Sequence, residues 1–175
     1  MSFYQKATAF GLKFTSQSKL FKFGFNFSPM YRRSTARIKH VSEDLLHVDI
    51  KLPISWKNRN YMNSIFGGSM FSATDPISMI QLVYILGSDY IVWDRSAEIV
   101  FKKPAKEDLY ADFDFNKAEV DQIIKDVEQK NEIDIQKKIF LTNRSKDTVY
   151  AEITKTLFIA DKTYFKEKKK KRNRN

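Results

Sequence analysis

Residues 67–86, GGSMFSATDPISMIQLVYIL, form a stretch that is apolar enough to be a core helix and is followed by Gly87. This stretch has the length and composition of one long buried helix that ends at the glycine. Much of the remaining chain has the patterns of β-strands. A single apolar helix among antiparallel strands can bury its surface if the sheet curls around it. The sequence therefore predicts an α+β fold in which a curved antiparallel sheet wraps a central helix.

Strand patterns lie on both sides of this helix. They occupy residues 35–41, 45–52, 90–103, 108–116, 132–143 and 148–160. Turn-forming residues at 42–44 and 144–147 predict two hairpins, and Pro104 ends the longest strand. Residues 117–130 are highly charged and predict a short exposed helix. The chain shows no repeat and no second domain, and 175 residues suffice for one domain with a sizeable core.

The net charge of +10 is concentrated at the two ends of the chain. Residues 1–33 hold six Lys or Arg and no acid, and residues 162–175 hold eight against one Glu, so residues 34–161 are mildly acidic at −3. A basic end of this kind is usually solvated, and we expect residues 162–175 to be a disordered tail. A role of this tail in binding RNA, phosphate or anionic lipid is the alternative.

The first 33 residues predict an additional basic helical segment. Apolar residues recur at spacings of three, four and seven with lysines among them, which is typical of an amphipathic helix. These positions are Phe3, Ala7, Phe10, Phe14, Phe21 and Phe25. Such a helix packs over the apolar surface of its own domain or lies on a membrane surface. The segment lacks the apolar core of a secretory signal, although its composition is compatible with a transit peptide.

The chain contains no cysteine and only two histidines, His40 and His47. Disulfides, thiolate metal sites and cysteine nucleophiles are therefore excluded, and we expect no bound metal. The hydrophobic content of 42% indicates a packed globule, while no apolar run approaches the ~20 residues that cross a bilayer. We expect a cytoplasmic protein.

The start of the central helix has the chemistry of an oxyanion hole. Gly67 and Gly68 leave helix N–H groups without intrahelical acceptors and without side chains in front of them. The helix dipole adds partial positive charge at the same place. A carbonyl group bound there would be polarised, and charge developing on its oxygen would be stabilised. The structural alternative is a tight helix entry packed against a strand.

One acid, Asp75, interrupts the apolar pattern between Phe71 and Met79 and has no obvious partner in the sequence. A carboxylate among apolar neighbours binds a proton more readily than one in water, which suits Asp75 as a general base acting on water. It could equally attack directly as a nucleophile. The structural alternative is that Asp75, which precedes Pro76, caps a second helical segment after a kink.

The central helix and its flanks resemble the hotdog-fold acyl-CoA thioesterases. The shared pattern is an Asn, a His or aromatic six residues later, a Gly-Gly helix start, and an acid eight residues after the first glycine. In this sequence these are Asn60, Phe66, Gly67, Gly68 and Asp75. The strand ending FKKPAK is similar to a family strand that ends in an aromatic and Pro-Ala. The pattern is of the phenylacetyl-CoA type, and FGGSM and DYIVWD are most similar to an uncharacterised bacterial branch.

The resemblance implies a thioesterase-like hydrolase in residues 34–161. Asp75 would act as base or nucleophile, and Asn60 would orient the carboxylate or the attacking water. Asn60 could instead be a turn residue. Phe66 stands where several relatives carry His, which leaves only backbone donors at the carbonyl. Asp94 lies where some relatives hold the attacking water, although it could pair with a surface Lys or Arg.

The same resemblance bears on the substrate and the assembly. Lys102, Lys103 and Lys106 are similar to a basic strand end at which relatives hold the phosphates of coenzyme A, which is part of the substrate and not a cofactor. Gly67 and Asp75 are about 12 Å apart at ~1.5 Å rise per helical residue, too far to serve one thioester. Hotdog relatives solve this by pairing subunits edge to edge. We therefore expect a homodimer or a dimer of dimers.

Two other classes of function remain alternatives at this point. The first is an acyl-binding or assembly protein that kept the helix and lost turnover. The second is a peripheral membrane or RNA-binding protein that acts through the basic ends of the chain.

Overall fold

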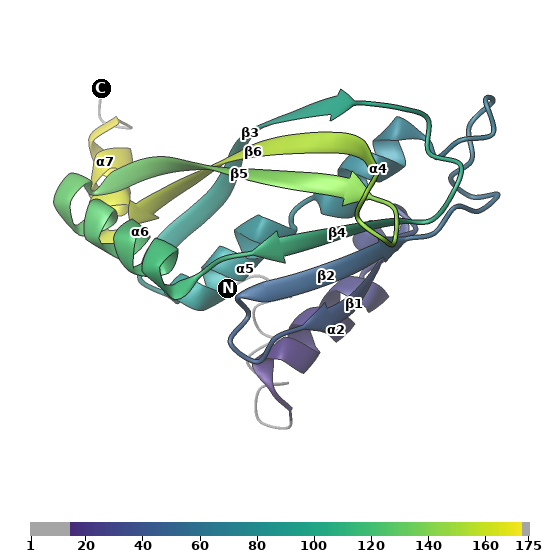
Figure 1. Ribbon diagram of the computed structural model, residues 1–175. Helices are drawn as coiled ribbons and strands as arrows, with labels where there is room; N and C mark the ends of the chain where they lie inside the picture. The colour runs from purple at the N-terminus through teal and green to yellow at the C-terminus, as the bar shows by residue number, and fades with distance from the viewer. Residues whose placement is uncertain (1–14, 173–175) are drawn as a thin grey trace.

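The structure is a computed structural model that describes residues 15–172 (Figure 1). The predicted amphipathic positions Phe3, Ala7, Phe10 and Phe14 lie outside the described residues.

Within residues 15–172, six strands form one antiparallel sheet (Figure 1). Its order is β1-β2-β4-β5-β6-β3, so β1 and β3 are the edge strands. The strands are β1 (Arg37–Val41), β2 (His47–Leu52), β3 (Tyr90–Phe101), β4 (Leu109–Asp114), β5 (Glu132–Thr142) and β6 (Val149–Asp161). Each lies in a predicted strand segment, and the two predicted hairpins, β1 with β2 and β5 with β6, are confirmed.

The central helix consists of two pieces, α4 (Gly67–Thr74) and α5 (Ile77–Leu86). The prediction of one continuous helix is therefore wrong at Asp75 and Pro76. Proline has no N–H to donate and disfavours the helical conformation in the residue before it. Asp75 accordingly has extended backbone angles, φ −100° and ψ 132°.

Both helical pieces pack against one face of the sheet and lie behind it in Figure 1. Ile77 and Leu82 of α5 are fully buried. Gln81 fixes α5 to the sheet, because its Nε2 donates to the backbone oxygens of Leu45 at 3.0 Å and Phe113 at 3.2 Å. The central helix is thus held in place by both apolar burial and buried hydrogen bonds.

The N-terminal segment forms α2 (Gln17–Phe27) and the short α3 (Pro29–Arg32). Phe21 and Phe25 of α2 are buried, and the Phe21 ring contacts the Tyr84 ring edge-on at 6.0 Å. For these two positions, packing over the domain's own apolar surface is confirmed.

The C-terminal half contains two further helices, α6 (Lys117–Lys130) and α7 (Lys162–Arg172). The predicted charged helix is confirmed as α6, although Val120, Ile123 and Val127 are buried in a second apolar cluster. The expectation of a disordered tail is wrong for residues 162–172. The aromatic ring of Phe165 anchors α7, since it packs edge-on against Trp93 of β3 at 5.1 Å.

Candidate active site

The first turn of α4 presents two free backbone donors. The N–H groups of Ser69 and Met70 both donate to the backbone oxygen of Phe66, at 2.9 and 3.2 Å. The N–H groups of Gly67 and Gly68 donate to no acceptor within residues 15–172. Phe66 is the N-cap residue and has no side-chain oxygen that could satisfy them. The predicted pair of unsatisfied donors is therefore present at this helix start.

Two aromatic rings explain why both positions are glycine. A Cβ on Gly67 would lie 2.7 Å from Cζ of Phe101, and a Cβ on Gly68 would overlap the ring of Phe66. Both rings are about half exposed, at 53% for Phe101 and 57% for Phe66. The alternative of a tight helix entry against a strand is therefore also supported, because Phe101 belongs to β3.

A pocket of about 540 Å³ opens beside this helix start. It collects five of the predicted site residues and adds Met62, Met70 and Phe101 as apolar lining. The predicted residues in its wall are Asn60, Gly67, Lys102, Lys103 and Lys106. Of the two predicted oxyanion donors, Gly67 lines the pocket and Gly68 does not, so the wall combines apolar side chains, one glycine of the helix start and a basic rim of three lysines.

The three lysines of the rim are exposed. Lys102 Nζ lies 3.5 Å from a carboxylate oxygen of Glu152, and Lys103 Nζ lies 5.7 Å from the centre of the Tyr150 ring. Exposed lysines of this kind keep their charge available to a phosphate in solution.

Asn60 holds a turn beside the pocket. Its side-chain oxygen accepts from the backbone N–H of Met62 at 2.9 Å, from the N–H of Ser64 at 3.1 Å, and from the hydroxyl of Ser64 at 3.1 Å. No hydrogen bond joins Asn60 to Asp75 within the described residues. The alternative of a turn residue is thus confirmed, since the carbonyl of Asn60 holds the turn that forms one wall of the pocket.

Asp75 lies at the opposite end of α4. Its Oδ1 accepts a bond from Nζ of Lys155, whereas its Oδ2 has no partner within residues 15–172, and the side chain is 44% exposed. The prediction of an unpaired acid among apolar neighbours is therefore wrong. The capping alternative is also wrong, because the N-cap position of α5 is Pro76 and no side chain caps that helix.

Lys155 was not predicted as a site residue, although it is only 1% exposed. It stands on β6 between Ile153 and Leu157, which are both fully buried and lie on the same face of the strand. Its Nζ also donates to Oδ2 of Asp94 at 3.0 Å. The signal in the sequence was a lysine on the apolar face of an alternating strand.

A β-bulge aims Asp94 at this lysine. Asp94 pairs with Leu157, but Ser96 pairs with Thr156, so Arg95 is the extra residue of the bulge. The regular alternation predicted for this strand is therefore interrupted at Arg95. Asp94 does pair with a lysine, as one alternative held, but the lysine is buried and not on the surface.

Burial raises the pKa of Asp94, and the neighbouring carboxylate of Asp75 raises it further, while the ammonium of Lys155 opposes both. The Oδ1 atom of Asp94 is buried and has no hydrogen-bond partner within residues 15–172. The three side chains form a compact cluster, in which one buried ammonium is shared by two carboxylates. Of the two carboxylates, Asp75 is the more exposed, at 44% against 23% for Asp94.

A comparison with known protein families assigns the chain to one of them. Residues 17–159 match the family described as "Domain of unknown function (DUF4442)". The chain belongs to the DUF4442 family. No curated protein matches the sequence.

Several solved structures are similar to this DUF4442 chain. One is a Pseudomonas aeruginosa protein described as a probable thioesterase, with 16% identity, a TM-score of 0.72, and coverage of 82% of this chain and 95% of that chain. Zebrafish thioesterase superfamily member 2 has 15% identity, a TM-score of 0.54, and coverage of 81% and 94%. A Chlorobaculum tepidum protein of unknown function has 15% identity, a TM-score of 0.65, and coverage of 82% and 93%. The shared fold is the hotdog fold, as predicted.

Within one chain of this DUF4442 protein, the two halves of the candidate site remain apart. The eight residues of α4 separate them by about 12 Å, given ~1.5 Å rise per residue. The pocket at Gly67 does not include Asp75, Asp94 or Lys155 in its wall.

No group of three or more acidic or histidine side chains suited to a metal occurs among the described residues. No helix in that same part of the chain is long and apolar enough to cross a membrane.

Proposed function

We propose that this protein hydrolyses a thioester, with an acyl-CoA as the substrate class, at a site assembled from two copies of the chain. The observation that supports this most is the asymmetry of α4. One end offers two free N–H groups beside an apolar, basic-rimmed pocket, and the other end offers a carboxylate with one anchored and one free oxygen.

The chemistry divides between these ends. The N–H groups of Gly67 and Gly68 would bind the thioester oxygen and stabilise the oxyanion. Asp75 would take a proton from water as the water oxygen bonds to the carbonyl carbon, or would itself attack. The carbon–sulfur bond then breaks, the sulfur leaves as a thiolate and is protonated, and the water route releases a carboxylic acid. If Asp75 attacks, the same cleavage leaves an anhydride of Asp75 with the acyl group, and water then hydrolyses this anhydride to the carboxylic acid. Coenzyme A enters only as the leaving group of the substrate.

Lys155 would act as a positioning residue in this scheme. It binds Oδ1 of Asp75, and Asp94 binds it in turn, so Oδ2 of Asp75 is left for the reaction. Lys155 would thus support catalysis by orienting Asp75 and not by contact with the substrate.

The edge strand β3 is the natural place for the second copy. It is twelve residues long and pairs only with β6 among the described strands. Trp93, Val100 and Phe101 on it are exposed by 36%, 40% and 53%. A long exposed edge with apolar side chains is a template for pairing with another chain.

Register links this edge to the site. Antiparallel pairing of two β3 strands about a two-fold axis through Glu98 would set Phe101 opposite Asp94 of the partner subunit, because the bulge residue Arg95 takes no place in the register. Phe101 contacts Gly67, and Asp94 shares Lys155 with Asp75. The helix start of one copy would then face the carboxylate cluster of the other. Two equivalent composite sites would result, in a homodimer or a dimer of dimers.

A hydrolysis screen over acyl-CoA chain lengths tests the proposal, with Asp75→Asn and Asp94→Asn as a matched pair. Each variant removes one of the two carboxylates on Lys155, so each disturbs the ion cluster alike. Loss of a general base costs roughly 100-fold or more in rate, and we expect that loss only in Asp75→Asn. Equal losses of hydrolysis rate in both variants would mean that Asp75 serves only as a counter-ion of Lys155 and not as the base.

Mixing two inactive variants tests the composite site. An Asp75→Asn subunit and a Gly67→Leu subunit should regain activity together, because a hybrid dimer has one intact site. Subunit exchange is confirmed by native mass spectrometry. If the hybrids form and stay inactive, or the active species sediments as a monomer, the two-copy site is wrong.

An acyl-CoA-binding protein without turnover is the second candidate. It is favoured by Asn60, whose oxygen is committed to its own turn, and by Phe66, which offers no side-chain donor. Saturable binding of acyl-CoA without hydrolysis at any chain length supports this candidate over the first.

A further inference from the structure

Helix α2 is fastened to the edge of the sheet by its side chains. Asn26 donates to the backbone oxygen of Ile38 and accepts from the N–H of Ile38, both at 2.9 Å, and so takes the place of a neighbouring strand. Lys22 Nζ donates to the backbone oxygen of Lys39 at 2.5 Å. These bonds satisfy part of the open edge of β1 and hold α2 in one orientation.

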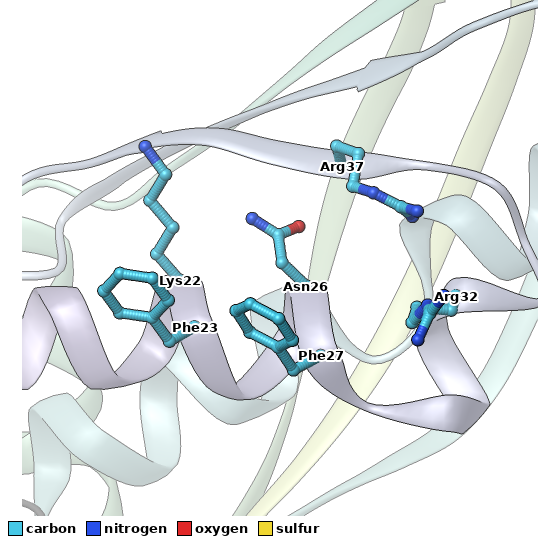
Figure 2. A pocket seen from close by; sticks show the side chains of 6 residues that line it. All are labelled: Lys22, Phe23, Asn26, Phe27, Arg32 and Arg37. Carbon is cyan, nitrogen blue, oxygen red and sulfur yellow. The ribbon is translucent and has the colours of Figure 1, made fainter.

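The outer face of the fastened helix presents large apolar side chains to solvent. Phe23 and Phe27 are exposed by 55% and 69%, and their rings stack at 6.0 Å with an angle of 24°. Met30 of α3 is exposed by 58%. Figure 2 shows the two phenyl rings side by side on one side of α2. This apolar ridge is separate from Phe21 and Phe25, which lie on the buried side.

Only basic charges accompany this ridge. Residues 15–42 contain no Asp or Glu and six cations, which are Lys19, Lys22, Arg32, Arg33, Arg37 and Lys39. None of the six forms an ion pair within residues 15–172. Lys22, Arg32 and Arg37 border a hollow of about 360 Å³ together with Asn26 and the two phenylalanines (Figure 2). We call this area the α2 surface.

We propose that the α2 surface binds the anionic face of a lipid bilayer, with Phe23 and Phe27 entering the headgroup region and the cations contacting lipid phosphates. Helices that bind at a membrane interface carry exposed aromatic side chains together with Lys and Arg. Helix α2 lies along the protein surface and has both. The absence of Asp and Glu from residues 15–42 complements a negative lipid surface. This proposal is independent of the hydrolase proposal and holds for a catalytic or a non-catalytic protein.

The geometry favours lipid over single-stranded nucleic acid. Bases stack on aromatic faces that are open, and here each ring has the other beside it, with the centroids 6.0 Å apart. Met30 adds an aliphatic group that offers a base neither a stacking face nor a hydrogen bond. Insertion into an apolar phase uses all three side chains, whatever their ring orientation.

Vesicle co-sedimentation of the full chain tests the proposal. We expect binding to vesicles of phosphatidylcholine mixed with phosphatidylserine and little binding to phosphatidylcholine alone. Each basic residue near an anionic surface is worth roughly a factor of five in affinity. Arg32→Gln/Arg37→Gln should therefore bind at least ~10-fold more weakly, and Phe23→Ser/Phe27→Ser should show a similar loss.

Two matched controls separate the α2 surface from general properties of the chain. Lys169→Gln/Lys171→Gln removes the same charge from α7, and Trp56→Ser removes an aromatic that is 83% exposed elsewhere. Both should bind within twofold of the wild type. All four altered positions of the test variants are exposed, so circular dichroism should show unchanged folding.

A Phe23→Trp probe reports insertion directly, since lipids brominated in their acyl chains quench an inserted indole. Quenching supports the proposal. Absence of binding to the mixed vesicles, equal losses in test and control variants, or binding without quenching overturns it. Tighter binding to polyuridine than to vesicles, or self-association that is abolished by the same variants, would assign the surface to RNA or to a second copy and equally overturn it.

Discussion

The two ends of α4 differ in how the nearby charged side chains are exposed to solvent. At its N-terminal end the charges are exposed lysines around a pocket, and the groups next to the helix are neutral N–H donors. At its C-terminal end an almost fully buried lysine lies between two carboxylates. An exposed lysine needs no partner, whereas a buried one is stable only when it is paired.

This difference indicates at which end of α4 a substitution should affect both ligand binding and the stability of the fold. Substitutions in the basic rim should change the affinity for an anionic ligand and leave the fold alone. Substitutions in the Asp75–Lys155–Asp94 cluster should change both. Because the helix keeps the two ends about 12 Å apart, a single copy cannot combine them, and the exposed edge of β3 is where a second copy can.

The largest expected effect is that of Lys155→Met. It leaves two neighbouring carboxylates without their counter-ion, and breaking a buried pair costs about 3 kcal/mol or more in the free energy of unfolding. Urea denaturation measures the loss. The triple variant Lys155→Met/Asp75→Asn/Asp94→Asn should recover most of it, since it removes all three charges. A loss well under 1 kcal/mol in the single variant would mean that solvent already screens the cluster.

A smaller effect is expected for Gly67→Ala at the other end of α4. The added Cβ would lie 2.7 Å from Cζ of Phe101, and overpacking of this kind costs roughly 1–2 kcal/mol. A double-mutant cycle with Phe101→Ala checks the cause. If the ring is responsible, Gly67→Ala should be harmless in the Phe101→Ala background. A loss of the same size in both backgrounds would point to the helix start itself.

The pH dependence of stability should reveal Asp94. Burial raises the pKa of Asp94 in the folded state above its ordinary value of 3.8, so folding favours the protonated form. The folded state therefore binds more protons than the unfolded state above about pH 4, and stability falls as the pH rises through this window. Relative to Asp94→Asn, the wild type should lose stability between about pH 4 and the raised pKa. Parallel stability curves for the two proteins would refute the raised pKa.

The smallest effect on stability is expected for Lys102→Gln/Lys106→Gln in the basic rim. Both side chains are exposed, and the single ion pair of Lys102 with Glu152 spans 3.5 Å, so the free energy of unfolding should change by less than about 0.5 kcal/mol. The KM for an acyl-CoA should rise while kcat is unchanged. A stability loss as large as that of Lys155→Met would contradict the expectation that only the lysine at the C-terminal end of α4 contributes to the stability of the fold.

Local patterns accounted for the strands and for the place of the helix start. Each of β1 to β6 overlaps a segment whose pattern predicted a strand. Such patterns are local, because alternate residues of a strand point to the same face of the sheet. The glycine pair was also readable, since a helix start needs no distant partner. The sequence singled out Asp75 as a site residue but not its ion pair, because its partner Lys155 lies 80 residues further along the chain.

The misplaced expectations share one cause. Lys155 looked like an ordinary strand lysine, the bulge at Arg95 left no mark in the alternation of its strand, and residues 162–172 looked too polar to order. In each case a contact with a distant segment decided the outcome. Phe165 shows this most simply, since one ring against Trp93 anchors a helix whose composition alone favoured disorder.

By itself, the sequence determined the strands, the apolar helix, the unsatisfied donors at Gly67 and Gly68, and the concentration of positive charge at the chain ends, because these properties depend on adjacent residues. Only the tertiary structure decided which charges meet, that Asp75 shares a buried lysine with Asp94, that Asn60 holds a turn, and that Phe23 and Phe27 face outward while Phe21 and Phe25 face inward. The physical reason is that the free energy of a buried charge or an apolar side chain depends on the segment that packs against it, and that segment comes from elsewhere in the chain.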